Sequence, residues 1–164
     1  MLYRRNWIAV TVLIFGLMMF MPNAQAQRQE FEAIQCLVGT LNVVHTSPEL
    51  GISSIDFKGI TQSTHESKLF DNWTRHTVLV FRREGNKTSF NGFTKALAPD
   101  GEFIIWEFSK DLQGEPIVKA IDGSGKWKGV KGEYTAKRIT KGKPVAPNSD
   151  QYCEKVTGWI ELPK

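Results

Sequence analysis

The chain alternates apolar and polar residues over short segments that are separated by glycine, asparagine and aspartate. Alternation with a period of two is typical of β-strands, because successive side chains of a strand point to opposite faces. No segment after residue 26 shows a convincing apolar stripe at helical spacing. The pattern therefore predicts an all-β protein, with strands at 34–44, 52–60, 75–82, 88–98, 102–109, 116–121, 133–140 and 152–162.

The connections between these segments carry turn residues. Residues 84–87 (Glu-Gly-Asn-Lys) and 99–101 (Pro-Asp-Gly) predict tight hairpins, because glycine and asparagine adopt the positive φ angles that such turns need. The segment 75–109 is therefore predicted to be a meander of three strands joined by hairpins. Segments 61–73 and 141–150 are predicted to be the longer loops.

The segments 75–82 and 102–109 are apolar on both faces. A face of this kind is covered by a helix, a loop or a second subunit, or else the sheet is one layer of a sandwich. Eight strands with a cysteine near each end favour a closed antiparallel barrel, which also removes exposed sheet edges. One of two alternating sets in 102–109 faces the interior, and the sequence leaves open which one: Phe103, Ile105 and Glu107, or Ile104, Trp106 and Phe108.

The first 26 residues predict a secretory signal peptide. Arg4 and Arg5 precede an apolar run at 8–21, and Ala24-Gln25-Ala26 forms a small-residue cleavage site. A spanning helix needs about 20 apolar residues, so a cleaved leader fits this shorter run better than an uncleaved anchor. The very apolar run also disfavours a twin-arginine signal. We expect cleavage after Ala26, a single domain at 27–164, a periplasmic or secreted location, and no membrane span after cleavage.

The charge balance argues against one class of partner. The chain holds 21 Lys and Arg against 17 Asp and Glu, a net charge of +4, and loss of the two leader arginines reduces it to +2. Nucleic-acid binders usually gather basic residues on one face beside aromatic platforms. The densest basic stretch, 126–143, is interrupted by glycines and apolar residues, which is typical of the solvated side of strands. We therefore expect no nucleic-acid partner.

Two cysteines, Cys36 and Cys153, remain after cleavage, and an even number in an exported chain predicts pairing. One intramolecular bridge would close a loop of more than 100 residues and tie the first strand to the last. A lipobox does not fit, because charged residues separate Cys36 from the apolar run. A reactive thiol does not fit either, because neither cysteine stands beside a histidine. We expect a Cys36–Cys153 disulfide.

A glycine-rich loop lies between 122 and 134. Its spacing does not match a dinucleotide fingerprint, a P-loop or an EF-hand, and no helix is predicted after it. Glycines permit a sharp bend and a close backbone approach, while Trp127 and Val130 are suited to plug one end of a β structure. We interpret the loop as structural and expect no cofactor. Its glycines are Gly123, Gly125, Gly129 and Gly132.

The same loop resembles the Gly-x-Gly-x-(Phe/Trp)-x-Gly-x-x-Gly stretch of the allene oxide cyclase and dirigent type of β-barrel, which includes small exported bacterial members. The resemblance covers about a third of the chain, centred on 120–140. It implies an eight-stranded, calycin-like barrel with an apolar cavity, often assembled as dimers or trimers. A homo-oligomer is therefore expected. The plant members act on oxidised fatty acids or phenoxy radicals, but none of their active-site residues can be placed on this sequence.

No constellation of residues predicts catalysis. His45, His65 and His76 are too scattered for a metal site, so we expect no metal. The sequence contains neither a Gly-x-Ser-x-Gly elbow nor paired carboxylates at a telling spacing. Glu107 is the one weak catalytic candidate, because burial on an interior face would raise its pKa, whereas at a strand end it would reach water. The residues expected to line a ligand cavity are Phe103, Ile105, Trp106 and Glu107.

The leading hypothesis is an exported, non-catalytic barrel that binds a small apolar or amphipathic molecule or a protein partner. The alternative is an isomerase or cyclase of the allene oxide cyclase type, because such enzymes act mainly by shaping a bound reactive substrate. A third class is a secreted inhibitor or envelope interaction protein that uses the loops 61–75 and 141–150. An inward Glu107 beside a large cavity would favour the enzyme, and a filled interior with exposed apolar loops would favour the interaction protein.

Overall fold

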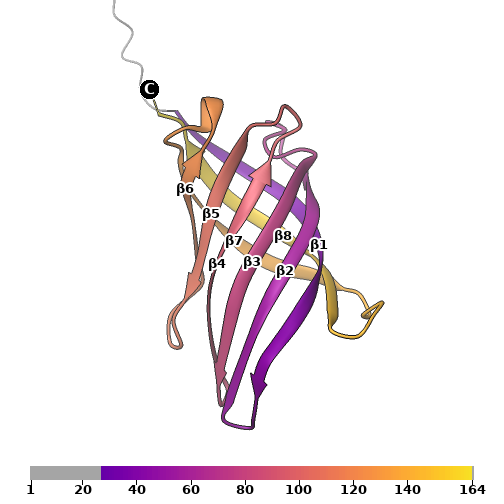
Figure 1. Cartoon of the computed structure of the whole chain (residues 1–164). Helices are drawn as coiled ribbons and strands as arrows, with labels where there is room; N and C mark the ends of the chain where they lie inside the picture. The colour runs from indigo at the N-terminus through magenta and orange to yellow at the C-terminus, as the bar shows by residue number, and fades with distance from the viewer. Residues whose placement is uncertain (1–26, 164) are drawn as a thin grey trace, which may run out of the picture.

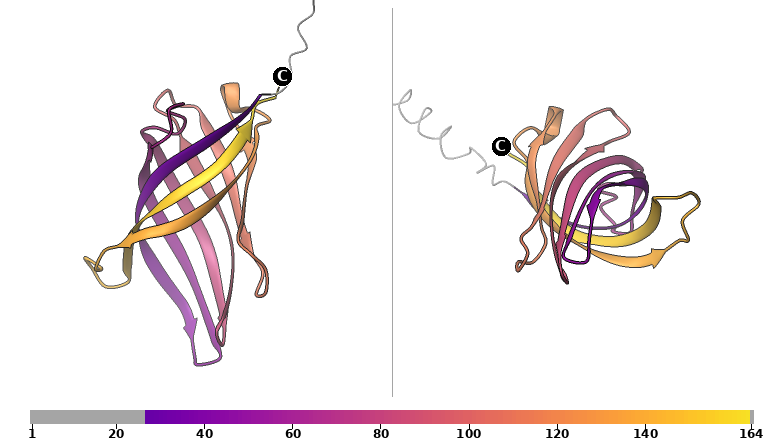
Figure 2. Two further views of the ribbon diagram at one scale, coloured as in Figure 1. Left: turned by 180° about the vertical axis from the view of Figure 1, so that it is seen from behind. Right: turned by 60° about the horizontal axis from the view of Figure 1, so that its bottom comes forward.

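The computed structural model describes residues 27–163, so the predicted signal peptide at 1–26 lies outside the described residues. Eight antiparallel strands form a closed barrel in which each strand pairs with the next and the last returns to the first (Figures 1 and 2). The elements are β1 (Arg28–Thr46), β2 (Leu50–Ser63), β3 (Trp73–Glu84), β4 (Lys87–Leu97), β5 (Phe103–Lys110), β6 (Ile117–Gly123), the 3-10 turn η1 (Gly125–Trp127), β7 (Lys131–Lys141) and β8 (Ser149–Glu161).

The predicted fold class is confirmed, and each predicted strand has a counterpart in the barrel. The first strand is longer than its apolar run suggested, because the segment from Arg28 to Ala33 forms a ladder with β8. Its charged residues Glu30 and Glu32 alternate with the buried Phe31. Within residues 27–163, no helix is long and apolar enough to cross a membrane.

Aromatic side chains fill one end of the barrel, which is the upper end in the orientation of Figure 1. Phe70, from the loop between β2 and β3, inserts its ring among those of Phe31 and Trp73, with centroid distances of 4.5 and 4.9 Å. The backbone of Phe70 has a φ of +65°, a conformation that large side chains adopt only when packing compensates the strain. This end of the barrel is a packed plug rather than a mouth.

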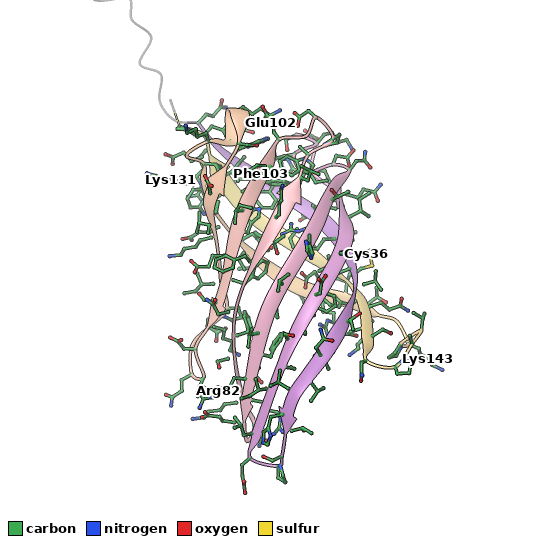
Figure 3. The ribbon with its side chains drawn as sticks, viewed as in Figure 1. Cys36, Arg82, Glu102, Phe103, Lys131 and Lys143 are labelled. Atoms are coloured by element: carbon green, nitrogen blue, oxygen red, sulfur yellow. A yellow bond between two sulfur atoms is a disulfide. The ribbon has the colours of Figure 1, made fainter. Side chains whose placement is uncertain are left out.

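The glycine-rich loop closes the same end. Trp127 of η1 and Val130 are buried there, as the sequence predicted, and the Trp127 ring lies 5.3 Å from that of Trp73. A Cβ atom at Gly123 would collide with the carbonyl group of Trp127. Gly125 has a φ of +54°, and its missing side chain leaves room for the carboxylate of Glu102, which lies at this end in Figure 3. Close approach therefore accounts for Gly123, and turn geometry accounts for Gly125.

The outer wall of β3 and β4 carries exposed apolar side chains. Val78, Val80 and Phe93 are each about half exposed, and Val78 lies directly beside Phe93 in the ladder. A sandwich is wrong as an explanation for the two-faced strands, because the sheet closes on itself. Among residues 27–163 no helix or loop covers these side chains, so the chain described here leaves that wall open.

The expected disulfide is present between Cys36 and Cys153. The two residues lie directly opposite each other in the ladder that closes β1 onto β8, and both side chains point away from the interior. The bridge joins positions that are 117 residues apart. It therefore restricts the unfolded chain more than a short-range crosslink would.

Replacing both cysteines in the variant Cys36→Ser/Cys153→Ser should lower the free energy of unfolding by about 2 to 4 kcal/mol. The barrel itself should still form, because the residues on either side of the bridge remain paired from Arg28 to Thr40. Urea unfolding followed by circular dichroism measures the difference, with the reduced wild-type protein as a control. An unchanged midpoint would contradict a stabilising role.

Candidate ligand site inside the barrel

Below the aromatic plug, polar side chains line part of the barrel interior, beside the buried apolar residues Leu37, Phe57 and Leu79. Gln35 is 1% exposed and Arg75 is 6% exposed, although long polar side chains are rarely buried to this extent. They meet Tyr134 from β7 and Glu154 from β8, so four strands contribute. The polar interior is completed by the hydroxyl groups of Thr61, Thr77 and Thr94.

Strand alternation and register place these residues together. Cys36 and Cys153 point outward, so their neighbours Gln35 and Glu154 point inward. In the ladders, Gln35 lies opposite Glu154 of β8 on one side and opposite Thr61 of β2 on the other. The polar cluster, which we define as Gln35, Thr61, Arg75, Tyr134 and Glu154, therefore depends on the register that closes the barrel.

Two hydrogen bonds organise the polar cluster. The Nε2 group of Gln35 donates to the carboxylate of Glu154. The Nη2 group of Arg75 donates to the hydroxyl oxygen of Tyr134 at 2.7 Å, and its guanidinium lies 5.4 Å from the centre of that ring. Both long side chains are thereby held toward the barrel axis, and the positive charges of Arg75 and Arg138 act on the Glu154 carboxyl group.

Three buried polar atoms of the cluster have no hydrogen-bond partner among the described residues: Oε1 of Gln35, Oγ1 of Thr61 and Nε of Arg75. Each buried group without a partner costs about 1 to 3 kcal/mol. The set includes an acceptor, a donor and a hydroxyl group that can serve as either. A small polar group with both donor and acceptor capacity, such as a hydroxyl or a carboxyl, would satisfy them.

Burial changes the protonation behaviour of two cluster members. Loss of water contact raises the pKa of the Glu154 carboxyl group, and the hydrogen bond from Gln35 and the charge of Arg75 oppose this only in part. Burial also raises the pKa of Tyr134 to about 12, against the influence of Arg75. Tyr134 therefore keeps its proton at neutral pH and remains a neutral hydroxyl group beside the guanidinium.

The wall of the barrel opens next to this cluster. β6 and β7 are joined at one register pair only, Lys119 with Glu133, whereas the other neighbouring strands form long ladders. A cavity of about 260 Å³ lies in the gap below that pair, and Val118 and Tyr134 are among the residues that line it. The gap therefore borders Tyr134, a member of the polar cluster, on the side of the barrel.

The structure decides which set of the fifth strand faces inward. Ile104 and Trp106 are buried in the core, and Trp106 is 1% exposed. Glu107 faces outward, where it pairs with Phe93 and Lys119 on the outer wall. It cannot supply an interior carboxylate, and Glu154 occupies that role instead. Phe103 and Ile105 share the outer face with Glu107, and of the four residues expected to line a cavity only Trp106 faces the interior.

The other residues singled out in the sequence do not gather into a site. The ring of His76 contacts Asp56 at 3.1 Å on the outer wall, and His65 contacts Ser67 at 3.0 Å in the loop between β2 and β3. His45 lies near the end of β1. Residues 27–163 contain no group of three or more histidine, cysteine, aspartate or glutamate side chains placed to hold a metal ion.

Sequence reasoning missed the polar cluster. A signal was present, because Gln35 and Glu154 each stand next to a cysteine that was predicted to pair. This position next to a cysteine does not predict burial by itself, because the sequence does not say whether the disulfide faces the interior or the solvent. Arg75 begins the predicted strand 75–82, and alternation alone does not say which face of that strand is inside.

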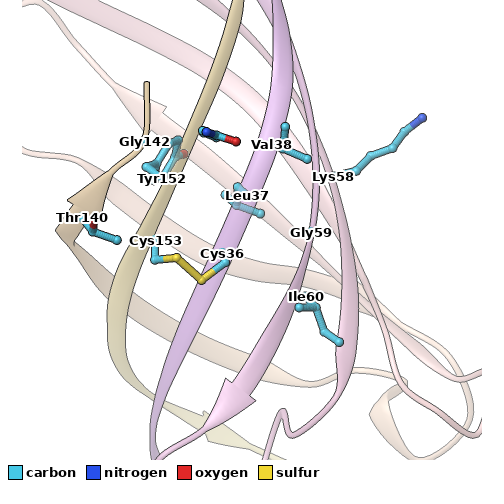
Figure 4. A pocket seen from close by; sticks show the side chains of 11 residues that line it. Cys36, Leu37, Val38, Lys58, Gly59, Ile60, Thr140, Gly142, Tyr152 and Cys153 are labelled. Carbon is cyan, nitrogen blue, oxygen red and sulfur yellow. A yellow bond between two sulfur atoms is a disulfide. The ribbon is translucent and has the colours of Figure 1, made fainter. Parts of the chain in front are cut away.

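A second hollow lies on the outer wall around the disulfide (Figure 4). This groove has a volume of about 560 Å³ and includes Val38 and Ile60, both about half exposed. Lys58 extends away from it in Figure 4. The amide of Gln151 is engaged with the carbonyl oxygen of Lys143 at 2.8 Å. The groove therefore offers few free polar groups that would orient a small molecule, and the interior cluster is the stronger site.

No protein-family model matches the sequence, and no curated protein matches it. Solved structures that are similar to the barrel include two pterocarpan synthase dirigent proteins. GePTS1 is 9% identical, with a TM-score of 0.53 over 86% of this chain and 94% of that one. PsPTS1 is 10% identical, with a TM-score of 0.51 over 85% and 99%. At these identities the likeness shows the fold alone, and it confirms the dirigent-type barrel.

The raised pKa of Glu154 predicts a pH-dependent difference between the wild type and Glu154→Gln. The pKa is higher in the folded than in the unfolded protein, so the folded state binds more protons between the two values. The contribution of Glu154 to stability therefore falls as pH rises above about 4.3, the ordinary glutamate pKa. Glu154→Gln should gain stability relative to the wild type as pH is raised from about 4 to about 7.

Urea unfolding at a series of pH values measures this difference, with the exposed loop variant Glu115→Gln as the control. A difference between the wild type and Glu154→Gln that stays constant with pH would show that Glu154 is not held in an environment that disfavours its charge.

Proposed function

We propose that the protein is an exported, non-catalytic barrel that binds a small amphipathic molecule in its interior, with the polar end of the molecule at the polar cluster. The observation that carries this proposal is the set of three buried polar atoms on Gln35, Thr61 and Arg75 that have no partner among the described residues. Structures rarely retain such groups without a function, because each lowers stability.

The chemistry of the cluster narrows the ligand class. The Nε–H group of Arg75 needs an acceptor, and Oε1 of Gln35 needs a donor. A hydroxyl or carboxyl group meets both needs, and the Arg75 charge favours a group with partial negative charge. The apolar body of the ligand would lie against the ring of Tyr134 and the lower edge of the aromatic plug, where Trp106 and Phe108 pack. The expected ligand is a small alcohol or acid with an apolar body.

The leader pattern and the disulfide support the proposed export. Residues 1–26 have the pattern of a cleaved signal peptide. The Cys36–Cys153 bridge is stable in an oxidising compartment such as the periplasm or the extracellular space. The ligand would then come from the medium or the cell envelope. The gap between β6 and β7 offers it a route to the interior.

A second candidate function is an isomerase or cyclase, and Glu154 is the observation that favours it. The raised pKa of this carboxyl group, beside a neutral Tyr134 hydroxyl and the Arg75 cation, suits proton transfer to a bound molecule. An enzyme would lose turnover in Glu154→Gln while keeping its affinity for the ligand.

The third hypothesis, an interaction protein, keeps only the exposed polar residues 64–68 of its first loop. Phe70 and Leu69 of the loop 64–72 turn into the core and are not offered to a partner.

Self-association remains part of the proposal, because the exposed outer wall of β3 and β4 is apolar and a second copy of the chain would bury it.

Native mass spectrometry of protein purified from its own host tests export and ligand retention together. The expected spectrum shows the mass of residues 27–164 with one disulfide, accompanied by a small molecule. The same spectrum reports dimers or trimers. A species that retains residues 1–26 after export would contradict the leader prediction.

Binding of the fluorescent probe 8-anilinonaphthalene-1-sulfonate, which joins an apolar ring system to an anionic group, tests the site. The probe should bind saturably and quench the tryptophan emission by energy transfer. It should bind at least tenfold more weakly to Arg75→Met, because a charge-assisted hydrogen bond contributes about 1.5 to 3 kcal/mol. The matched control is Arg82→Met, whose exposed side chain lies at the lower end of the barrel (Figure 3).

Thr61→Val provides a second variant that keeps the side-chain volume and removes only the hydroxyl group. It guards against the chance that Arg75→Met fails to fold, which circular dichroism reveals. Probe binding that is equal in the wild type and in both folded cluster variants would show that the interior cluster is not the site.

A further inference from the structure

β7 has a free edge. On one side it pairs with β8 along its whole length, from Lys131 to Lys141. On the other side it pairs with β6 only at Glu133. Below that pair the two strands diverge, β6 running down the barrel and β7 crossing it toward the opposite side (Figures 1 and 2). The segment 135–141, which we call the β7 edge, therefore has no strand partner on this side among the described residues.

The β7 edge is also accessible. Every residue from 135 to 141 is exposed, in contrast to the alternating burial of the central strands. In an antiparallel strand every second residue directs its backbone N–H and C=O groups to the same side. A free edge therefore presents a row of donors and acceptors that an added strand can satisfy.

The charge of the β7 edge indicates what it accepts. The segment contains Lys137, Arg138 and Lys141 and no acidic residue. The guanidinium of Arg138 packs over the ring of Tyr152, at 4.1 Å from its centre, so the two lysines carry the charge of the open edge. Lys141 is paired with Asp150 at 3.4 Å, whereas Lys137 has no ion-pair partner among the described residues. Two copies of this edge would bring like charges together, which disfavours self-pairing. An acidic strand would not meet this repulsion.

The gap beside the edge adds a socket for an apolar side chain. The cavity of about 260 Å³ between the strands is lined by Ile117 and Val118 on one side and by Tyr134 and Thr135 on the other. It lies at the upper end of the free edge, where a strand added to β7 would pass. A side chain of a large aliphatic or aromatic residue would fill it.

We propose that the β7 edge binds an extended acidic segment of a partner polypeptide by strand addition, with one apolar side chain of that segment in the gap between β6 and β7. Main-chain hydrogen bonds to 135–141 supply the affinity, and the lysines and the socket supply the selectivity. The proposal does not rest on ligand binding in the interior, because the backbone groups of 135–141 lie outside the polar cluster. Tyr134 is the residue that the socket shares with the cluster.

The test uses the mature protein and a fluorescein-labelled, blocked ten-residue peptide of alternating glutamate and valine. Fluorescence anisotropy should show saturable binding at least tenfold tighter than that of the matched lysine–valine peptide. Hydrogen exchange should slow at every second amide of 135–141, where the N–H groups point to the free side. A glutamate–valine peptide methylated on its backbone nitrogens should lose binding, because it cannot donate ladder hydrogen bonds.

A matched pair of variants locates the binding. Lys137→Glu should weaken binding of the acidic peptide about fivefold, because reversing one surface charge changes the binding free energy by about 1 kcal/mol. Lys58→Glu carries the same change on the outer face of β2 and should leave binding unchanged, because its side chain points away from the β7 edge.

Equal binding of the acidic and basic peptides would overturn the proposal, as would full retention of binding by the methylated peptide. Protection from exchange at another segment would also overturn it. Slowed exchange at 135–141 that appears without peptide and increases with protein concentration would assign the edge to a second copy of the chain instead.

Discussion

The register with which β1 closes onto β8 is the constraint on which the interior depends. Cys36 faces Cys153 on the outside of that seam, and this arrangement turns Gln35 and Glu154 toward the barrel axis. A slip of one residue would exchange the two faces of a strand. The disulfide therefore does more than restrict the unfolded chain, because it excludes registers in which the polar cluster would face solvent.

The interior is divided between two kinds of packing. Its upper end is a packed aromatic plug, in which Phe70 holds a left-handed backbone because its ring contacts those of Phe31 and Trp73. Below it, Arg75 and Glu154 are removed from water, which costs stability unless their polar atoms are satisfied. Only part of that need is met by Tyr134 and Gln35. A small ligand that supplies the rest would stabilise the folded state as it binds.

Closure of the barrel is uneven, and the weak seam has two consequences. One register pair joins β6 to β7, so the wall opens beside the polar cluster and leaves the rest of β7 as a free edge. The lysines of that edge protect it from pairing with itself. Access to the interior and recognition of an extended acidic segment thus arise from the same divergence of two strands, and Tyr134 borders both.

The sequence by itself determined the all-β class, the positions of the strands and turns, the pairing of the two cysteines, and the plugging role of Trp127. These follow from local patterns, because alternation and turn residues act within a few positions of each other. Alternation defines two faces of a strand but does not say which is inside, so Glu107 and Trp106 could not be assigned from the sequence. Gln35 and Glu154 stand 119 residues apart, and only the closed barrel brings them together. The tertiary structure decided the site, because its polar groups come from strands whose mutual register is not written in any one of them.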